Sequence, residues 1–137
     1  WRINSESETY NWKYIEDIDI ESERMWNDII SMAGRMISDE ELFLKYRQYQ
    51  ICHMYDQFII NEGSIHNPGA FRTRIKRIKN VIRKYGEDNL RFRSNIVPEY
   101  RRTRIILTLL SVHMYSAAYL FNIWYKKKRE LKNRSKA

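Results

Sequence analysis

A run of basic residues between Phe71 and Tyr85 is the part of the sequence whose composition and spacing most clearly suggest chemistry. It contains seven Lys or Arg residues and no Asp or Glu. Large apolar residues recur within it at the spacing of one helix face, at Phe71, Ile75, Ile78 and Ile82. A helix whose other faces are all cationic repels itself unless an anion lies beside it, and a phosphate backbone is the commonest such anion. The run therefore predicts a helix that binds nucleic acid, with a solvated amphipathic helix as the alternative.

Five more arginines follow this run and extend the predicted interface. Arg91, Phe92 and Arg93 place an aromatic ring between two cations, which suits phosphate contact with base or ribose stacking, although a surface turn has the same composition. Contacts of this kind fix position more than they read sequence, and they weaken steeply with salt. The predicted RNA-binding residues are Arg72, Arg74, Lys76, Arg77, Lys79, Arg83, Lys84, Arg91, Arg93, Arg101, Arg102 and Arg104.

Residue types that carry catalysis or bind metals are sparse and badly spaced. His53, His66 and His113 are far apart, and Cys52 has no partner at the spacing of a metal site. Cys52 and His53 are adjacent on an expected helix and so point about 100° apart, which is a poor arrangement for a nucleophile and its base. The four glycines form no phosphate-cradling loop. We therefore expect no enzyme, no metal and no cofactor.

Charge is distributed very unevenly along the chain. Residues 1–65 contain 6 basic and 13 acidic side chains, a net charge of −7, whereas residues 66–137 contain 19 and 4, a net charge of +15. Such asymmetry is typical of a protein that lies on nucleic acid at one end and contacts protein or solvent at the other. The single cysteine excludes an internal disulfide and fits a reducing compartment.

The segment from Gly63 to Arg83 resembles the large-subunit ribosomal protein twenty-nine family. That family has a glycine, an aliphatic residue and Asn-Pro in a loop, followed by a basic helix. The matching positions are Gly63, Ile65, Asn67 and Pro68 in the loop, and Ile75, Arg77, Ile78, Lys79, Val81, Ile82 and Arg83 in the helix. The resemblance implies a two-helix hairpin that binds large-subunit ribosomal RNA near the polypeptide exit tunnel, beside ribosomal protein twenty-three and other ribosomal proteins.

Three features favour a mitochondrial member of this family, bound to the ribosome in the matrix. The chain is longer than the bacterial type, its N-terminal arm is acidic and aromatic, and it continues beyond the family's hairpin. A cytosolic eukaryotic member would also be long, but we would expect it to be rich in lysine throughout.

The expected fold is all-α, an antiparallel two-helix hairpin with an N-terminal arm and a long C-terminal helix. Residues 1–20 lack a sustained helical pattern and predict an extended arm that docks through aromatic rings. Residues 21–86 form the expected hairpin core, in which a first helix covers 21–36 and a second begins with Ser38 as N-cap and Glu41 three residues on. This second helix packs antiparallel against the basic helix. Residues 87–97 are expected to be a basic loop.

Residues 98–137 predict one long helix, from Pro98 to about Lys132. Its apolar segment from Ile105 to Tyr125 is about as long as a bilayer-crossing helix. A small membrane-anchored accessory subunit of a mitochondrial complex is therefore the alternative function. Polar residues interrupt this apolar segment and favour a helix buried among protein and RNA instead of lipid. They are Thr108, Ser111, His113, Tyr115, Tyr119 and Asn122. A viral or parasite helical interaction module is a third possibility.

Overall fold

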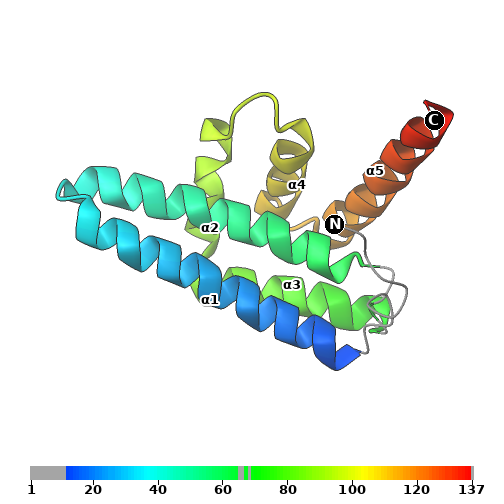
Figure 1. Ribbon diagram of the computed structural model, residues 1–137, viewed down its shortest axis with the longest axis horizontal. Helices are drawn as coiled ribbons and strands as arrows, with labels where there is room; N and C mark the ends of the chain where they lie inside the picture. The colour runs from blue at the N-terminus through cyan, green and yellow to red at the C-terminus, as the bar shows by residue number, and fades with distance from the viewer. Residues whose placement is uncertain (1–11, 65–66, 68, 137) are drawn as a thin grey trace.

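A computed structural model describes residues 12–64, 67 and 69–136, and side chains from Ile18 onward. Within these residues the protein is entirely helical and contains no strand, so the all-α prediction is confirmed. The described residues form five α-helices and one 3₁₀-helix (Figure 1): α1 Trp12–Met36, α2 Glu40–Glu62, α3 Phe71–Tyr85, η1 Glu87–Asn95, α4 Arg101–Ser111 and α5 Tyr115–Ser135.

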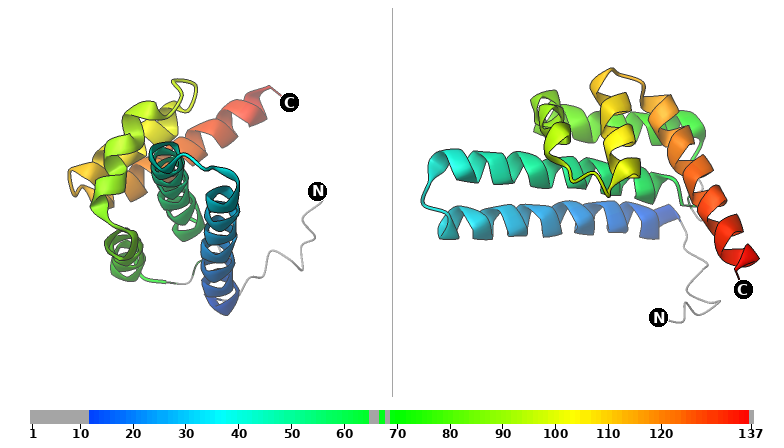
Figure 2. Two further views of the ribbon diagram at one scale, coloured as in Figure 1. Left: turned by 90° about the vertical axis from the view of Figure 1, so that its left-hand side faces the viewer. Right: turned by 90° about the horizontal axis from the view of Figure 1, so that it is seen from above.

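Helix α2 lies at the centre of the molecule. Helix α1 runs antiparallel along one side of it, and α3 returns antiparallel along another (Figures 1 and 2). The C-terminal elements η1, α4 and α5 also pack against α2. The basic helix that dominates the sequence is therefore one of several elements arranged around α2.

One hydrophobic core joins the α2–α3 pair to the C-terminal elements. Helix α2 contributes Ile51, Tyr55 and Ile59 to it, all fully buried. Every later element also contributes buried core side chains, among them Ile78 and Ile82 of α3, Leu90 of η1, Ile106 and Leu107 of α4, and Ala118 of α5. Helix α1 covers this core from outside, with Trp26 and Ile30 packed against it. The C-terminal elements therefore complete the core that α2 and α3 begin.

The expectation of an extended arm over residues 1–20 is wrong where the structure describes them. Residues 1–11 lie outside the described part, but α1 begins at Trp12 rather than near residue 21. A hydrogen bond across the fold holds this first part of α1, in which Asn61 of α2 donates to Oδ1 of Asp19 at 3.0 Å. One turn further on, Lys84 and Tyr85 of α3 contact the Glu23 carboxylate. Partners far away in sequence thus stabilise a segment whose local pattern is weak.

Two smaller expectations also need correction. The N-cap of α2 is Asp39 rather than Ser38, because Oδ1 of Asp39 accepts a hydrogen bond from the Leu42 amide at 3.1 Å. Most of the predicted basic loop is the 3₁₀-helix η1, which begins after Gly86. Gly86 has φ +104°, a backbone conformation that side chains rarely permit, and its carbonyl accepts a hydrogen bond from the Tyr55 hydroxyl at 2.8 Å.

The predicted single helix over 98–132 is in fact two helices, α4 and α5. Helix α4 ends in a Schellman motif, in which the Met114 amide donates to the Leu109 carbonyl and the His113 amide to the Leu110 carbonyl. His113 has φ +62° in the position that glycine usually occupies, so no glycine or proline in the sequence marks the break. The apolar segment is therefore divided between two helices, and none of the described helices is long and apolar enough to cross a bilayer.

Candidate nucleic-acid interface

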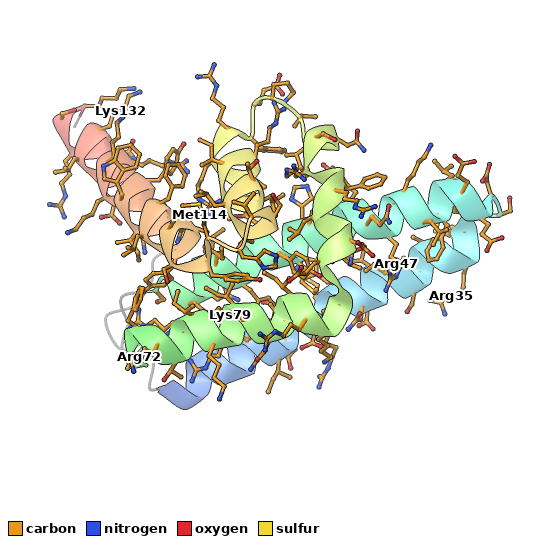
Figure 3. The ribbon with its side chains drawn as sticks, turned by 180° about the vertical axis from the view of Figure 1, so that it is seen from behind. Arg35, Arg47, Arg72, Lys79, Met114 and Lys132 are labelled. Atoms are coloured by element: carbon orange, nitrogen blue, oxygen red, sulfur yellow. The ribbon has the colours of Figure 1, made fainter. Side chains whose placement is uncertain are left out.

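Four cations form one stripe along the outer face of α3. Residues Arg72, Lys76, Lys79 and Arg83 are spaced by four, three and four, so they lie within a narrow sector of the helix and cover about 16 Å along it. Three are exposed, and the half-buried Lys79 lies over the Tyr115 ring, 5.3 Å from its centroid. Figure 3 shows Arg72 and Lys79 along α3, which lies in front in that view. We call these four residues the α3 stripe.

The face of α3 next to this stripe, about 100° around the helix, is apolar, as the sequence predicts. Ile75, Ile78 and Ile82 are buried against the core. The fourth predicted core residue, Phe71, is 45% exposed and packs the edge of its ring against Tyr119, at 5.5 Å between centroids. The predicted separation into an apolar face and a cationic face is therefore observed in α3, with Phe71 at its margin.

A flank of α3 finds acidic partners on other helices, which the sequence did not predict. Lys84 and Tyr85 both donate to the Glu23 carboxylate of α1. Burial alone would raise the pKa of Glu23, but these two hydrogen bonds lower it overall. Nη1 of Arg77 lies 3.5 Å from Oε2 of Glu62, a fully buried carboxylate of α2. The basic helix therefore has acidic partners on this flank, whereas the α3 stripe forms no ion pair with the side chains that the structure describes.

Arg74 is committed to the loop between α2 and α3. Its Nε donates to the Gly69 carbonyl at 2.7 Å, and Nη1 donates to the Tyr119 hydroxyl at 2.7 Å. Nη1 also donates to the Glu62 carbonyl, and Nη2 to the Asn67 carbonyl. With four hydrogen bonds inside the protein, Arg74 holds the loop and α5 to α3. It is not part of the α3 stripe, and its role in RNA binding stays a prediction.

The same loop contains a buried polar cluster around Glu62. Nδ2 of Asn67 donates to Oε2 of Glu62 at 2.8 Å, while Oδ1 of Asn67 accepts from the Gly69 amide at 2.8 Å. Asp19 of α1 lies next to this cluster. Its burial, together with a hydrogen bond to Glu62, raises its pKa from 3.8 to about 7. Asn67, matched above to a family loop position, thus has a structural role that its own contacts explain.

The five predicted arginines after α3 also divide into exposed side chains and side chains bound within the protein. Arg91, Arg101 and Arg104 are exposed, although Arg91 lies 3.7 Å from the exposed Asp88. Arg93 is half-buried and donates to the Leu90 carbonyl at 3.0 Å.

Arg102 points inward, where the sequence predicts an RNA-binding residue, and that role stays a prediction. Its Nη1 donates to Oδ2 of Asp56 at 3.0 Å, and its Nη2 donates to Oδ1 of Asn122 at 2.6 Å. Thr103 donates to Oδ2 of the same carboxylate at 2.9 Å. Arg102 therefore joins α4 to α2 and α5 from within.

The structure also shows a groove between the start of α4 and the distal half of α5 that the sequence analysis missed. It has a volume of about 990 Å³, and its described lining residues include four aromatic rings and six cations, with Glu99 as the only acid among them. Trp124 and Tyr100 are each 53% exposed there. On α5 the contributing residues follow one another at helical spacing, so their pattern was detectable: Phe121, Trp124, Tyr125, Lys128, Arg129 and Lys132.

The residues considered for catalysis have structural roles. Cys52 is fully buried, and its thiol donates to the Asn89 carbonyl at 2.9 Å; burial raises its pKa to about 12. The His53 ring lies among Trp26, Tyr49 and Tyr100, and burial lowers its pKa. Within the described residues, no group of three or more His, Cys, Asp or Glu could hold a metal ion.

These features define an all-helical protein with a one-sided cationic helix and a second cationic groove lined with aromatic rings. Comparison with protein-family models, with curated proteins and with solved structures finds no match for this chain. The resemblance described above thus depends on the loop and helix residues alone.

Proposed function

We propose that this protein is a structural, non-enzymatic component of a large ribosomal subunit and that it binds ribosomal RNA through the α3 stripe. The observation that carries the proposal is the separation of cations on α3. Those on its inner side and flank are held by protein, including Arg74 by carbonyls and Lys84 by Glu23, whereas three of the four stripe residues are exposed to solvent. In the part of the chain that the structure describes, Arg72, Lys76 and Arg83 form no ion pair.

A phosphate backbone fits this stripe better than a scattered set of small anions. Its cations are spaced along a rigid helix whose apolar face is fixed in the core, so their positions are set before binding. A linear array of this kind neutralises several phosphates of one strand and gains from the release of their counterions. Arg91, Arg101 and Arg104 provide further exposed cations on the following elements.

The choice of a ribosome rests on the family resemblance. We propose that α2, the loop and α3 correspond to the hairpin of the ribosomal protein twenty-nine family, with α1 and the α4–α5 pair as additions. By that correspondence the protein lies near the exit tunnel beside ribosomal protein twenty-three. The additions around the hairpin favour a mitochondrial ribosome in the matrix.

Sedimentation of the tagged protein from a detergent lysate tests this function. We expect it to travel with a large ribosomal subunit and to leave that position after RNase treatment. The variant Arg72→Gln/Lys76→Gln/Arg83→Gln is expected to lose this association. The control Arg24→Gln/Arg35→Gln/Lys45→Gln removes the same charge from exposed positions on α1 and α2 and is expected to keep it. RNase-insensitive migration, or equal loss in both variants, would contradict the proposal.

A further inference from the structure

We propose that the groove between α4 and α5 is a second nucleic-acid site, one that takes an unpaired segment of RNA. It lies outside the segment that resembles a known family and uses residues other than the α3 stripe. The inference rests on the proposed function only for the choice of RNA as the polymer. Bases would stack on the exposed rings of Tyr100 and Trp124, and the phosphates beside them would meet cations from both helices.

The aromatic side chains give the first argument. Half-exposed Trp and Tyr rings in a groove offer flat apolar faces to bases of any sequence, which is how proteins bind single strands without reading them. The Trp124 ring lies 5.7 Å from that of Phe121, which is partly buried against the core and so supports it. The ammonium of Lys128 lies 4.9 Å from the centroid of the Trp124 ring. A base stacked at Trp124 would therefore have a cation beside it for its phosphate.

The charge of the lining gives the second argument. The groove is lined by Arg101 of α4 and by Lys128, Arg129 and Lys132 of α5, and the only acidic side chain among its described lining residues is Glu99. The distal half of α5, with Lys132 near its end, extends away from the body of the protein (Figures 1 and 3). A paired duplex keeps its bases stacked inside and could use only the cations, and the same is true of an acidic peptide. An unpaired RNA strand uses both the cations and the rings.

The wall of the groove is fixed before any ligand binds. Arg102 lines it, while its guanidinium contacts Asp56 of α2 and Asn122 of α5. Asn122 in turn donates to the Ile59 carbonyl of α2 at 3.4 Å. This network sets the position of α4 relative to the first half of α5, so binding requires little ordering of the protein.

The test measures binding of the full chain to a labelled oligouridylate and to a labelled hairpin duplex RNA by fluorescence anisotropy. Two variants remove two lysines each from α5: Lys128→Gln/Lys132→Gln inside the groove and Lys126→Gln/Lys127→Gln outside it. A third, Trp124→Ala, removes the stacking surface, and Leu120→Ala, an exposed position on the same helix outside the groove, is its control. Trp124→Phe keeps a ring but removes the indole fluorescence.

We expect Trp124→Ala and the groove lysine pair each to weaken oligouridylate binding about tenfold, with both controls within about twofold of the wild type. Oligouridylate should quench tryptophan fluorescence in the wild type and much less in Trp124→Phe, whose affinity should be retained. Trp124→Ala should leave duplex binding close to wild type, because a duplex cannot use the rings, and the groove lysine pair should weaken duplex binding less than oligouridylate binding.

Equal weakening by the two lysine pairs, or wild-type affinity in Trp124→Ala, would overturn the inference. So would tighter binding of polyglutamate or of anionic lipid vesicles than of oligouridylate at the groove, because either would identify another occupant. The inference and the proposed function can fail separately. A protein that does not sediment with a ribosomal subunit but shows the groove-specific losses would refute the function and support the groove site.

Discussion

Arg102 and Asp56 are 46 residues apart in sequence and form a buried ion pair, with Nη1 of Arg102 2.9 Å from Oδ1 and 3.0 Å from Oδ2 of the carboxylate. The Arg102 side chain is only 17% exposed. Its other donors reach Oδ1 of Asn122, so one guanidinium links α2, α4 and α5. The position of both C-terminal helices therefore depends on this pair.

Asp56→Asn should lower the free energy of unfolding by about 3 kcal/mol, because it leaves a buried guanidinium without its counter-charge. Urea denaturation followed by circular dichroism measures the loss. The matched control is Glu41→Gln on the same helix, which removes an exposed ion pair with Lys45 and should cost less than about 0.5 kcal/mol. Similar losses in the two variants would mean that Arg102 does not hold the C-terminal helices in place.

Gly63→Ala should destabilise the protein by about 1–3 kcal/mol through overpacking. A Cβ at this position would lie 2.7 Å from Nδ2 of Asn122 and 3.2 Å from the Ile59 carbonyl, while the φ of −81° suits any residue. Gly34→Ala, within α1, is the control: its Cβ would meet only the Phe43 ring at 3.3 Å, and alanine favours helix. Unchanged stability in Gly63→Ala would show that α5 does not approach the end of α2 this closely.

Deprotonation of Asp19 should lower the free energy of unfolding as the pH rises from about 4 to about 7. Its pKa is raised from 3.8 to about 7 in the folded protein, so the folded state holds a proton that the unfolded chain releases. The stabilisation that the protonated Asp19 gives the folded state is fully present below about pH 4 and is lost as the pH rises through about 7. Asp19→Asn should remove it, making the variant more stable than wild type at pH 8 by about 1–2 kcal/mol after screening of this half-buried group.

Urea titrations of Asp19→Asn at pH 5 and pH 8 measure this effect, and Asp28→Asn, an exposed position on the same helix, serves as control. If the difference in stability between wild type and Asp19→Asn is the same at both pH values, the buried position of Asp19 beside Glu62 is wrong.

Cys52 should react with a thiol reagent at pH 8 at least about a hundred times more slowly in the folded protein than in urea, because only the exposed thiolate is the nucleophile. The thiol is buried, donates to the Asn89 carbonyl, and has its pKa raised to about 12. It is the only cysteine, so the labelling rate reports on this site alone. Rapid labelling of the native protein would contradict the packing of α2 against η1.

The sequence predicted those helices whose apolar periodicity and end residues are visible within their own segment. The period of Ile75, Ile78 and Ile82 gave α3, and the extent of α2 followed from its apolar stripe and the break at Gly63. The end of α4 could not be predicted, because His113 occupies a backbone position that normally selects glycine. The helical start of α1 was not predicted for a different reason, since Asn61, which donates a hydrogen bond to Asp19 there, lies on α2.

Of the candidate site, the sequence could predict the residue types but not which of them face inward. Arg72 and Arg74 are near neighbours in one basic run, yet one is exposed and the other is bound by loop carbonyls. Arg101 and Arg102 differ in the same way. The groove depends on bringing Tyr100 next to Trp124, which the predicted continuous helix would have prevented.

The salt dependence of duplex RNA binding tests most directly the claim that the α3 stripe contacts phosphates. Each lost phosphate contact reduces the slope of log K against log salt by about 0.7–0.9. Arg72→Gln/Lys76→Gln/Arg83→Gln should therefore reduce the wild-type slope by about 2–3, whereas Arg24→Gln/Arg35→Gln/Lys45→Gln should leave it unchanged. A slope that the stripe variant does not alter, or that both variants reduce equally, would contradict RNA binding by this face of α3.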